Sequence, residues 1–164
     1  MTIAFLIGVI LFISYVIVAT IKFGILPSLS DSFYKYGGKP KGYIFTIAMW
    51  ATVFLIMPLW FSVTKDIFTF STFLACGGLL FVGAAPVFKG EDNKWHQIFA
   101  IICAVFALLW QVLNKQYWEI PVVILIIAIL IVFTKSWKQC KTFWLEMIAF
   151  FSTFLSIGIK NILG

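Results

Sequence analysis

Residues 1–21, MTIAFLIGVILFISYVIVATI, contain no charged side chain and are followed by Lys22. A helix needs about 20 mostly apolar residues to cross a hydrocarbon core of about 30 Å, so this stretch is long enough to span a membrane. It has no basic segment ahead of the apolar run and no small-residue cleavage site, which favours a retained span over a cleaved signal peptide. The pattern decides the fold because similar runs recur along the whole chain.

Composition places the chain among membrane proteins. Hydrophobic residues make up 63% of the 164 positions and charged residues 11%, whereas soluble domains have about 45–50% and about 25%. We therefore predict an all-α integral membrane bundle that forms a single domain over residues 1–164. The predicted transmembrane helices are six in number and cover residues 1–22, 43–63, 67–88, 95–113, 117–133 and 142–163.

The positive charge of the chain is carried by lysine and is distributed unevenly between the loops. The first, third and fifth loops and the adjoining span ends contain Lys22, Lys35, Lys39, Lys41, Lys89, Lys94, Lys135, Lys138 and Lys141, whereas the opposite side has Lys65, Lys115 and Lys160. Short lysine-rich loops remain cytoplasmic, so we expect a multi-pass protein of the bacterial inner (cytoplasmic) membrane with both termini outside the cytoplasm. The lysines indicate contact with anionic lipid headgroups, and no nucleic-acid partner is expected.

The sequence contains none of the common catalytic or cofactor motifs. It has no P-loop, dinucleotide fingerprint, G-x-S-x-G or H-E-x-x-H pattern, and its single histidine excludes a multi-histidine metal site within one chain. Three cysteines without a C-x-x-C pair suggest neither a disulfide framework nor a zinc site. We expect no cofactor and no metal.

An eight-residue pattern occurs twice, as FSTFLACG at residues 70–77 and as FSTFLSIG at residues 151–158. The two copies fall in the third and sixth spans, where a 3+3 inverted repeat would place them. The alternative is chance recurrence in a composition rich in these residues. Small residues at helical spacing also predict close helix approach. They are Ser71, Ala75 and Gly78 in the third span and Ala149, Ser152 and Ser156 in the sixth.

The first loop carries capping signals. Ser28 and Asp31 in SLSDSFY have capping-box spacing, and Gly37-Gly38 can end a short helix, so an interfacial helix is predicted here. SLSDSFY, after the first span of a six-span protein, resembles the Ser-Asp loop of the Frag1/DRAM group of small membrane proteins. The layout is also similar to that of small uncharacterised bacterial polytopic proteins. The resemblance implies a small polytopic membrane protein, and no catalytic residue is carried over from it.

Two titratable residues stand near the cytoplasmic starts of spans. The stretch GEDNKWH, residues 90–96, favours a capped start of the fourth span, with His96 in the first turn. Glu146 in the sixth span is either a functional acid or one that reaches water or a loop lysine. Candidate catalytic residues are His96, Glu146 and Asp31, with none assigned. Candidate binding residues are Lys89, Lys94, Lys138, Lys141, His96 and Glu146.

Three functions are compatible with these patterns. The favoured one is a non-enzymatic membrane module, an accessory subunit or effector that assembles with a protein partner or as a homo-oligomer and binds anionic lipid at its cytoplasmic face. The second is a small transporter or oligomeric pore, favoured by the repeated pattern. The third is a lipid-active membrane enzyme with His96 as general base, oriented by Glu146 or Asp31.

Overall fold

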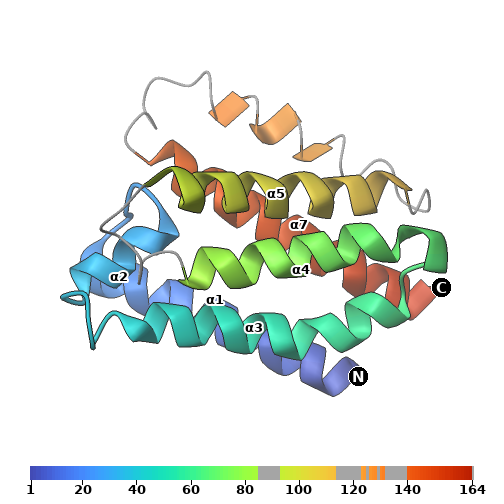
Figure 1. Ribbon diagram of the computed structural model, residues 1–164, viewed down its shortest axis with the longest axis horizontal. Helices are drawn as coiled ribbons and strands as arrows, with labels where there is room; N and C mark the ends of the chain where they lie inside the picture. The colour runs from blue at the N-terminus through green and yellow to red at the C-terminus, as the bar shows by residue number, and fades with distance from the viewer. Residues whose placement is uncertain (85–92, 114–122, 125, 129, 132–139, 164) are drawn as a thin grey trace.

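A computed structural model shows the chain as a bundle of long helices (Figure 1). It describes residues 1–84, 93–113, 123–124, 126–128, 130–131 and 140–163, with the side chains of α5 described from Ile98 onward. The helices are α1 (Thr2–Phe23), α2 (Ser32–Lys35), α3 (Tyr43–Ser62), α4 (Thr69–Ala84), α5 (Asn93–Leu113) and α7 (Lys141–Leu163), with 3-10 turns η1 (Leu29–Asp31) and η2 (Asp66–Phe68). The described residues contain no strand, which confirms the all-α prediction for this part of the chain.

Four helical segments are long and apolar enough to cross a membrane, namely Thr2–Phe23, Tyr43–Ser62, Asp66–Ala84 and Lys141–Leu163. They match the predicted first, second, third and sixth spans. The predicted fourth span is helical in α5, whose apolar part, Ile98–Leu113, is shorter. Most of the predicted fifth span, 117–133, lies outside the described residues. The chain is therefore an all-helical protein with helices able to span a membrane, and the count of six stays a prediction.

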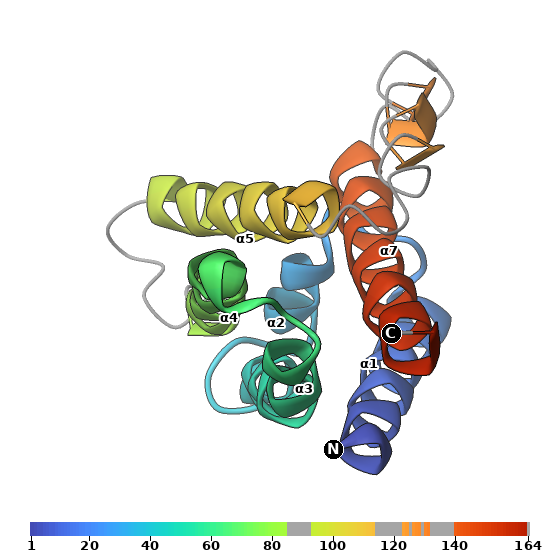
Figure 2. The ribbon, with the colours of Figure 1, turned by 90° about the vertical axis from the view of Figure 1, so that its right-hand side faces the viewer.

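Helices α1, α3, α4 and α5 alternate in direction along the bundle, and α7 runs in the same direction as α5 (Figure 1). Helix α1 packs against α3, α3 against α4 and α4 against α5, while α7 contacts α5 and α3. Viewed along the bundle, α5 is inclined relative to α4 and extends toward α7 (Figure 2). Met1 and the end of α7 lie at the same end of the bundle, and the loop between α1 and α3 lies at the other.

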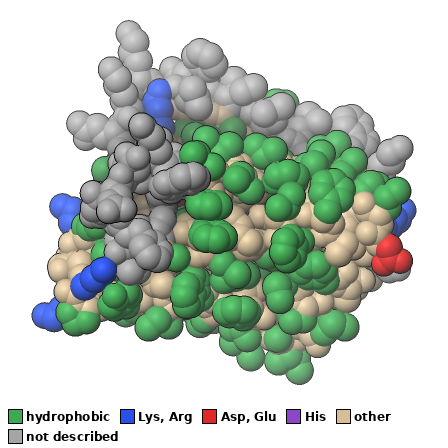
Figure 3. Space-filling model, viewed as in Figure 1, with side chains coloured by type: hydrophobic (Ala, Val, Ile, Leu, Met, Phe, Trp, Pro, Cys, Tyr) green, Lys and Arg blue, Asp and Glu red, His purple; other side chains and the backbone are tan. Residues whose placement is uncertain are grey.

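Large apolar side chains cover the outside of the bundle. Ile3, Ile21 and Ile162 are 75%, 81% and 78% exposed. In the space-filling view, hydrophobic side chains cover the middle of the molecule and charged ones gather at its two ends (Figure 3). Exposed apolar surface of this extent is typical of a protein that faces lipid.

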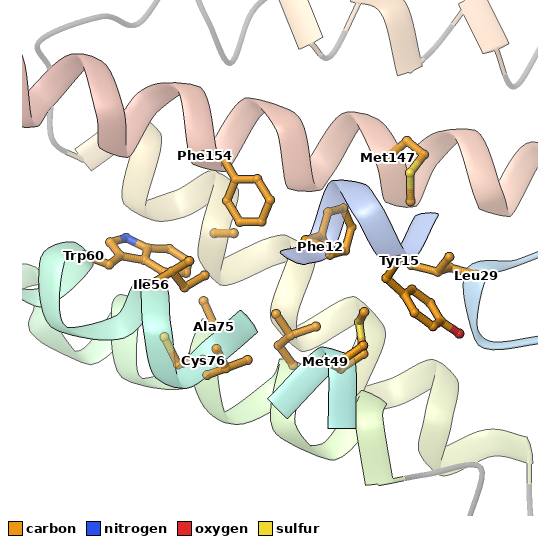
Figure 4. Packing of buried hydrophobic residues seen from close by; sticks show 14 of the residues in the cluster. Phe12, Tyr15, Leu29, Met49, Ile56, Trp60, Ala75, Cys76, Met147 and Phe154 are labelled. Carbon is orange, nitrogen blue, oxygen red and sulfur yellow. The ribbon is translucent and has the colours of Figure 1, made fainter. Parts of the chain in front are cut away.

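Aromatic side chains fill the contact between α1 and α7 (Figure 4). Phe12 is fully buried, and its ring centroid lies 4.3 Å from that of Phe150 and 5.4 Å from that of Phe154. Such pairs contribute about 0.5–1.5 kcal/mol beyond their buried area. These rings link the first helix of the chain to the last one.

The predicted small-residue faces behave differently in α4 and α7. Ser71 and Ala75 are fully buried, and a Cβ atom built on Gly78 would lie 2.9 Å from the backbone nitrogen of Cys103 in α5. This face of α4 therefore allows the close helix approach predicted from the sequence. On α7, Ser156 donates a hydrogen bond to the side chain of Gln111 instead.

Two buried polar clusters connect helices in the half of the bundle that holds the chain ends. Trp110 Nε1 donates to Thr64 Oγ1 at 2.7 Å, and Thr64 lies 3.0 Å from the hydroxyl of Thr72. Gln111 Nε2 lies 3.4 Å from Ser152 Oγ. Hydrogen bonds of this kind hold neighbouring helices together where water is absent.

The repeated FSTFL pattern has similar burial in its two copies. The paired positions that are buried in both helices are Ser71 and Ser152, Thr72 and Thr153, Ala75 and Ser156, and Cys76 and Ile157. Phe154 is buried whereas its counterpart Phe73 is exposed. Helices α4 and α7 run in opposite directions, as an inverted repeat would have them (Figure 1). The relation between the two halves of the chain stays a prediction.

We expect Gly78→Ala to lower the free energy of unfolding by about 1–3 kcal/mol, because the added methyl group would push α5 away from α4. Gly77→Ala is the matched control, since no atom lies within 4 Å of a Cβ at that position. It should be neutral or raise stability by up to about 1 kcal/mol through helix propensity. Unfolding by denaturing detergent, followed by circular dichroism, measures both. Equal stability of the two variants would show that α4 and α5 tolerate separation.

Candidate functional site

The loop between α1 and α3 folds onto the end of the bundle through a capping box. The Ser28 backbone N–H donates to Asp31 Oδ2 at 3.1 Å, and the Ser28 hydroxyl donates to the same oxygen at 3.1 Å. This confirms the capping box predicted from the spacing. Gly37, at φ 100°, follows α2 and ends it, also as predicted.

The Ser32 side chain links this loop to α1 through hydrogen bonds. This side chain is fully buried and donates to the Leu29 carbonyl at 2.6 Å. Because the single hydroxyl proton of Ser32 is used in that bond, the hydrogen bond between Ser32 and Tyr15 has the Tyr15 hydroxyl as its donor. The SLSDS segment is thus held by its own serine and aspartate side chains and by α1.

Glu146 joins the same loop to α7. Its Oε2 atom accepts the Leu29 backbone N–H at 2.7 Å. One turn earlier, the Phe143 N–H donates to the Pro27 carbonyl at 3.0 Å, so a helix-start N–H without an intrahelical partner is satisfied by the loop. These two hydrogen bonds connect residues that are more than 100 positions apart in the sequence.

The structure brings together two of the three candidate catalytic residues. Asp31 and Glu146 accept the N–H groups of consecutive residues, Ser28 and Leu29. The third, His96, lies in the first turn of α5, and its side chain is outside the described part of the chain. The predicted contact between His96 and Glu146 therefore stays a prediction.

Several lysines surround this loop. Lys22, Lys35, Lys39 and Lys41 are exposed, and Lys22 Nζ lies 4.6 Å from the ring centroid of Tyr36. Lys141 is the half-buried first residue of α7. Of the other predicted binding lysines, Lys89 and Lys138 lie outside the described residues, and Lys94 is described in its backbone alone. We call Lys22, Lys35, Lys39 and Lys41 the lysine rim.

Burial and a neighbouring negative charge both raise the pKa of Tyr34. Burial raises the pKa of its hydroxyl group, and the nearby Asp31 carboxylate raises this pKa further. Tyr34 is therefore neutral at physiological pH and contributes no negative charge to the lysine rim.

A cavity of about 230 Å³ lies among α3, α4, α5 and α7, and Glu146 is one of its lining residues. The α5 side of the cavity is lined by small side chains, including Ala100, Ala104 and Ala107. Trp60 lines it from α3. Its side chain is 3% exposed, and its indole N–H has no hydrogen-bond partner among the described residues.

Sequence reasoning did not identify the cavity or Trp60. The alanine spacing in α5 was the available signal, since three alanines occur within eight residues on a helix. In the described residues, no group of three His, Cys, Asp or Glu side chains could hold a metal ion.

In comparisons with known proteins, no family model, no curated protein and no solved structure matches this chain. The likeness of SLSDSFY to the Ser-Asp loop stays a resemblance. Functional inference therefore rests on the geometry of the all-helical bundle, its docked loop and its cavity.

We expect Glu146→Ala to destabilise the docked loop, because the Leu29 N–H would lose its acceptor, at a cost of about 1–3 kcal/mol. Glu146→Gln keeps an acceptor oxygen and should lose less. Hydrogen exchange of the residue 25–35 segment, followed by mass spectrometry, should be faster in the alanine variant. Asp66→Ala, at the other end of the bundle, is the control. Unchanged exchange in Glu146→Ala would show that the loop does not need this carboxylate.

Proposed function

We propose that this chain is a non-enzymatic membrane module, an accessory subunit or effector, which binds anionic lipid headgroups through its lysine rim. The observation that carries the proposal is the docked first loop, which displays Lys35, Lys39 and Lys41 on a folded surface. Its carboxylate partners, Asp31 and Glu146, are used to hold backbone N–H groups. This use is structural and favours a binding surface over a reaction centre.

The proposed orientation follows from the same lysines. We place the lysine rim at the cytoplasmic face of a bacterial inner membrane, because lysine-rich short loops are retained there. Each basic residue near the surface of an anionic cytoplasmic leaflet gains about 1 kcal/mol of binding free energy. Both chain termini are then outside the cytoplasm, and six helices cross the membrane. The apolar outer surface and the small-residue faces offer contacts for a protein partner or a second copy.

A small transporter is the second candidate. It is supported by the similar burial of FSTFL in α4 and α7 and by their opposite directions. Ion or solute flux into liposomes distinguishes it from the module. The lipid-active enzyme is the third candidate, with His96, Glu146 and Asp31 as its residues. Turnover lost in His96→Ala with normal expression would favour it.

We expect the triple variant Lys35→Ala, Lys39→Ala, Lys41→Ala to bind phosphatidylglycerol at least tenfold more weakly than the native protein at low salt. The reason is the loss of about 1 kcal/mol for each lysine, or about fivefold each. Native mass spectrometry in detergent with added lipid measures the binding. Lys65→Ala, at the other end of the bundle, should bind normally, and phosphatidylcholine binding should not change. Equal phosphatidylglycerol binding by the triple variant and Lys65→Ala would refute the lipid-binding rim.

The orientation can be tested with cysteine labelling. In a variant whose native Cys76, Cys103 and Cys140 are replaced by serine, we expect Thr2→Cys to react with a membrane-impermeant maleimide in intact cells or spheroplasts. Lys39→Cys should react only after the membrane is permeabilised, because the two positions lie at opposite ends of the bundle (Figure 1). The reverse pattern would invert the proposed topology.

A further inference from the structure

The cavity bounded by α5 and α7 combines an elongated apolar shape with one acidic group. On α7 its lining residues extend from Thr142 to Phe154, twelve residues apart, and the part from Glu146 to Phe154 covers eight residues. At 1.5 Å per residue this corresponds to about 18 Å along the helix, of which about 12 Å separates Glu146 from Phe154. Apart from Glu146 and two threonines, the lining side chains are hydrophobic residues.

The acid lies near one end of this cavity. Glu146 comes one turn after Thr142. Trp60 and Phe154 line the other end, and both lie away from Met147, the residue that follows Glu146 (Figure 4). One carboxylate oxygen, Oε2, is used by the Leu29 N–H. The other, Oε1, has no hydrogen-bond partner among the described residues. A carboxylate in apolar surroundings is stabilised by a positive charge or a hydrogen-bond donor beside it.

We propose that the cavity binds a single-chain cationic amphiphile, with its ammonium group at Glu146 and its alkyl chain extending toward Trp60. The volume of about 230 Å³ is smaller than the roughly 300–1,000 Å³ of drug-sized ligand sites. This size fits one alkyl chain and does not fit a two-chain lipid.

The length of the cavity limits the length of the chain. An extended chain advances about 1.2 Å per backbone atom, so the roughly 12 Å between Glu146 and Phe154 accommodates about 10 atoms. Decylamine has about this length and carries a primary ammonium group at one end. The alanines of α5 allow the chain to pass, because larger side chains at Ala104 and Ala107 would fill the space that it needs.

This inference goes beyond the proposed lipid-binding rim. The rim consists of lysines and attracts anions, whereas the cavity presents an acid and selects for a cation. The two sites also use different residues, so each can be tested with its own variants.

Photo-crosslinking tests the proposal. The probe is a decylamine with a diazirine near the tail end, added to the native protein in phosphatidylcholine nanodiscs. Adducts are mapped by mass spectrometry. We expect adducts on residues at the Trp60 end of the cavity, such as Ala107 and Phe154, and competition by unlabelled decylamine. Decanol should compete about tenfold more weakly, since it lacks the charge.

Three variants separate the contributions of charge, shape and the lysine rim. Glu146→Gln keeps an acceptor for the Leu29 N–H and should reduce labelling about tenfold or more. Ala104→Phe should abolish labelling by filling the cavity, and the smaller change Ala104→Val serves if the phenylalanine variant misfolds. The double variant Lys39→Ala, Lys41→Ala should be labelled normally.

Two results would overturn the proposal. One is equal labelling of Glu146→Gln and the native protein, which would show that the acid does not select the head group. The other is adducts confined to lipid-facing residues such as Ile10 and Ile17, which would place the probe outside the cavity. Either result leaves the test of the lysine rim unaffected.

Discussion

The hydrogen bond from the Leu29 N–H to Glu146 joins two parts of the chain that are 117 residues apart. At this end of the bundle the chain leaves its helical form after α1, and backbone groups that are not in a helix need partners where water is scarce. The N–H groups of Ser28 and Leu29 donate to the carboxylates of Asp31 and Glu146. The Pro27 carbonyl accepts a hydrogen bond from an N–H in the first turn of α7. The position of α7 against α1, and with it the packing of Phe12 among the rings of α7, depends on this junction.

Away from this end, side-chain packing and a small number of polar links hold the helices together. Several hydroxyl groups in the spans donate to carbonyls of their own helix, as Thr52 does to Ala48 and Thr153 to Ala149. Such bonds satisfy the hydroxyl group without linking two helices. Polar links between helices occur at Thr64 and Gln111, in the half that holds the chain ends. In the other half, the side chains of Thr46 and Trp50 donate to carbonyl groups of α4. The remaining contacts between the helices depend on side-chain packing.

The sequence was sufficient for features that depend on local spacing. Helices α1, α3 and α7 follow from run length and hydropathy, and the Ser28–Asp31 capping box follows from its three-residue separation. The partner of Glu146 could not be predicted, because a side chain that bonds to a distant backbone N–H leaves no pattern in the sequence. The cavity could not be predicted either. Small residues at helical spacing produce close contact at Gly78 but open space at Ala104, and the inclination of α5 decides between these outcomes (Figure 2).

Glu146 connects the loop to the cavity because its two oxygen atoms face different partners. Oε2 holds the Leu29 N–H, and Oε1 is the atom assigned to a bound ammonium group. A cation at Oε1 favours the ionised carboxylate, which is also the stronger acceptor for the Leu29 N–H. A ligand that binds the docked form more tightly than the undocked form stabilises docking by the same free energy. Occupancy of the cavity would thereby tighten the loop that carries Lys35, Lys39 and Lys41, and a bound anionic lipid that orders the same loop would in turn favour occupancy of the cavity.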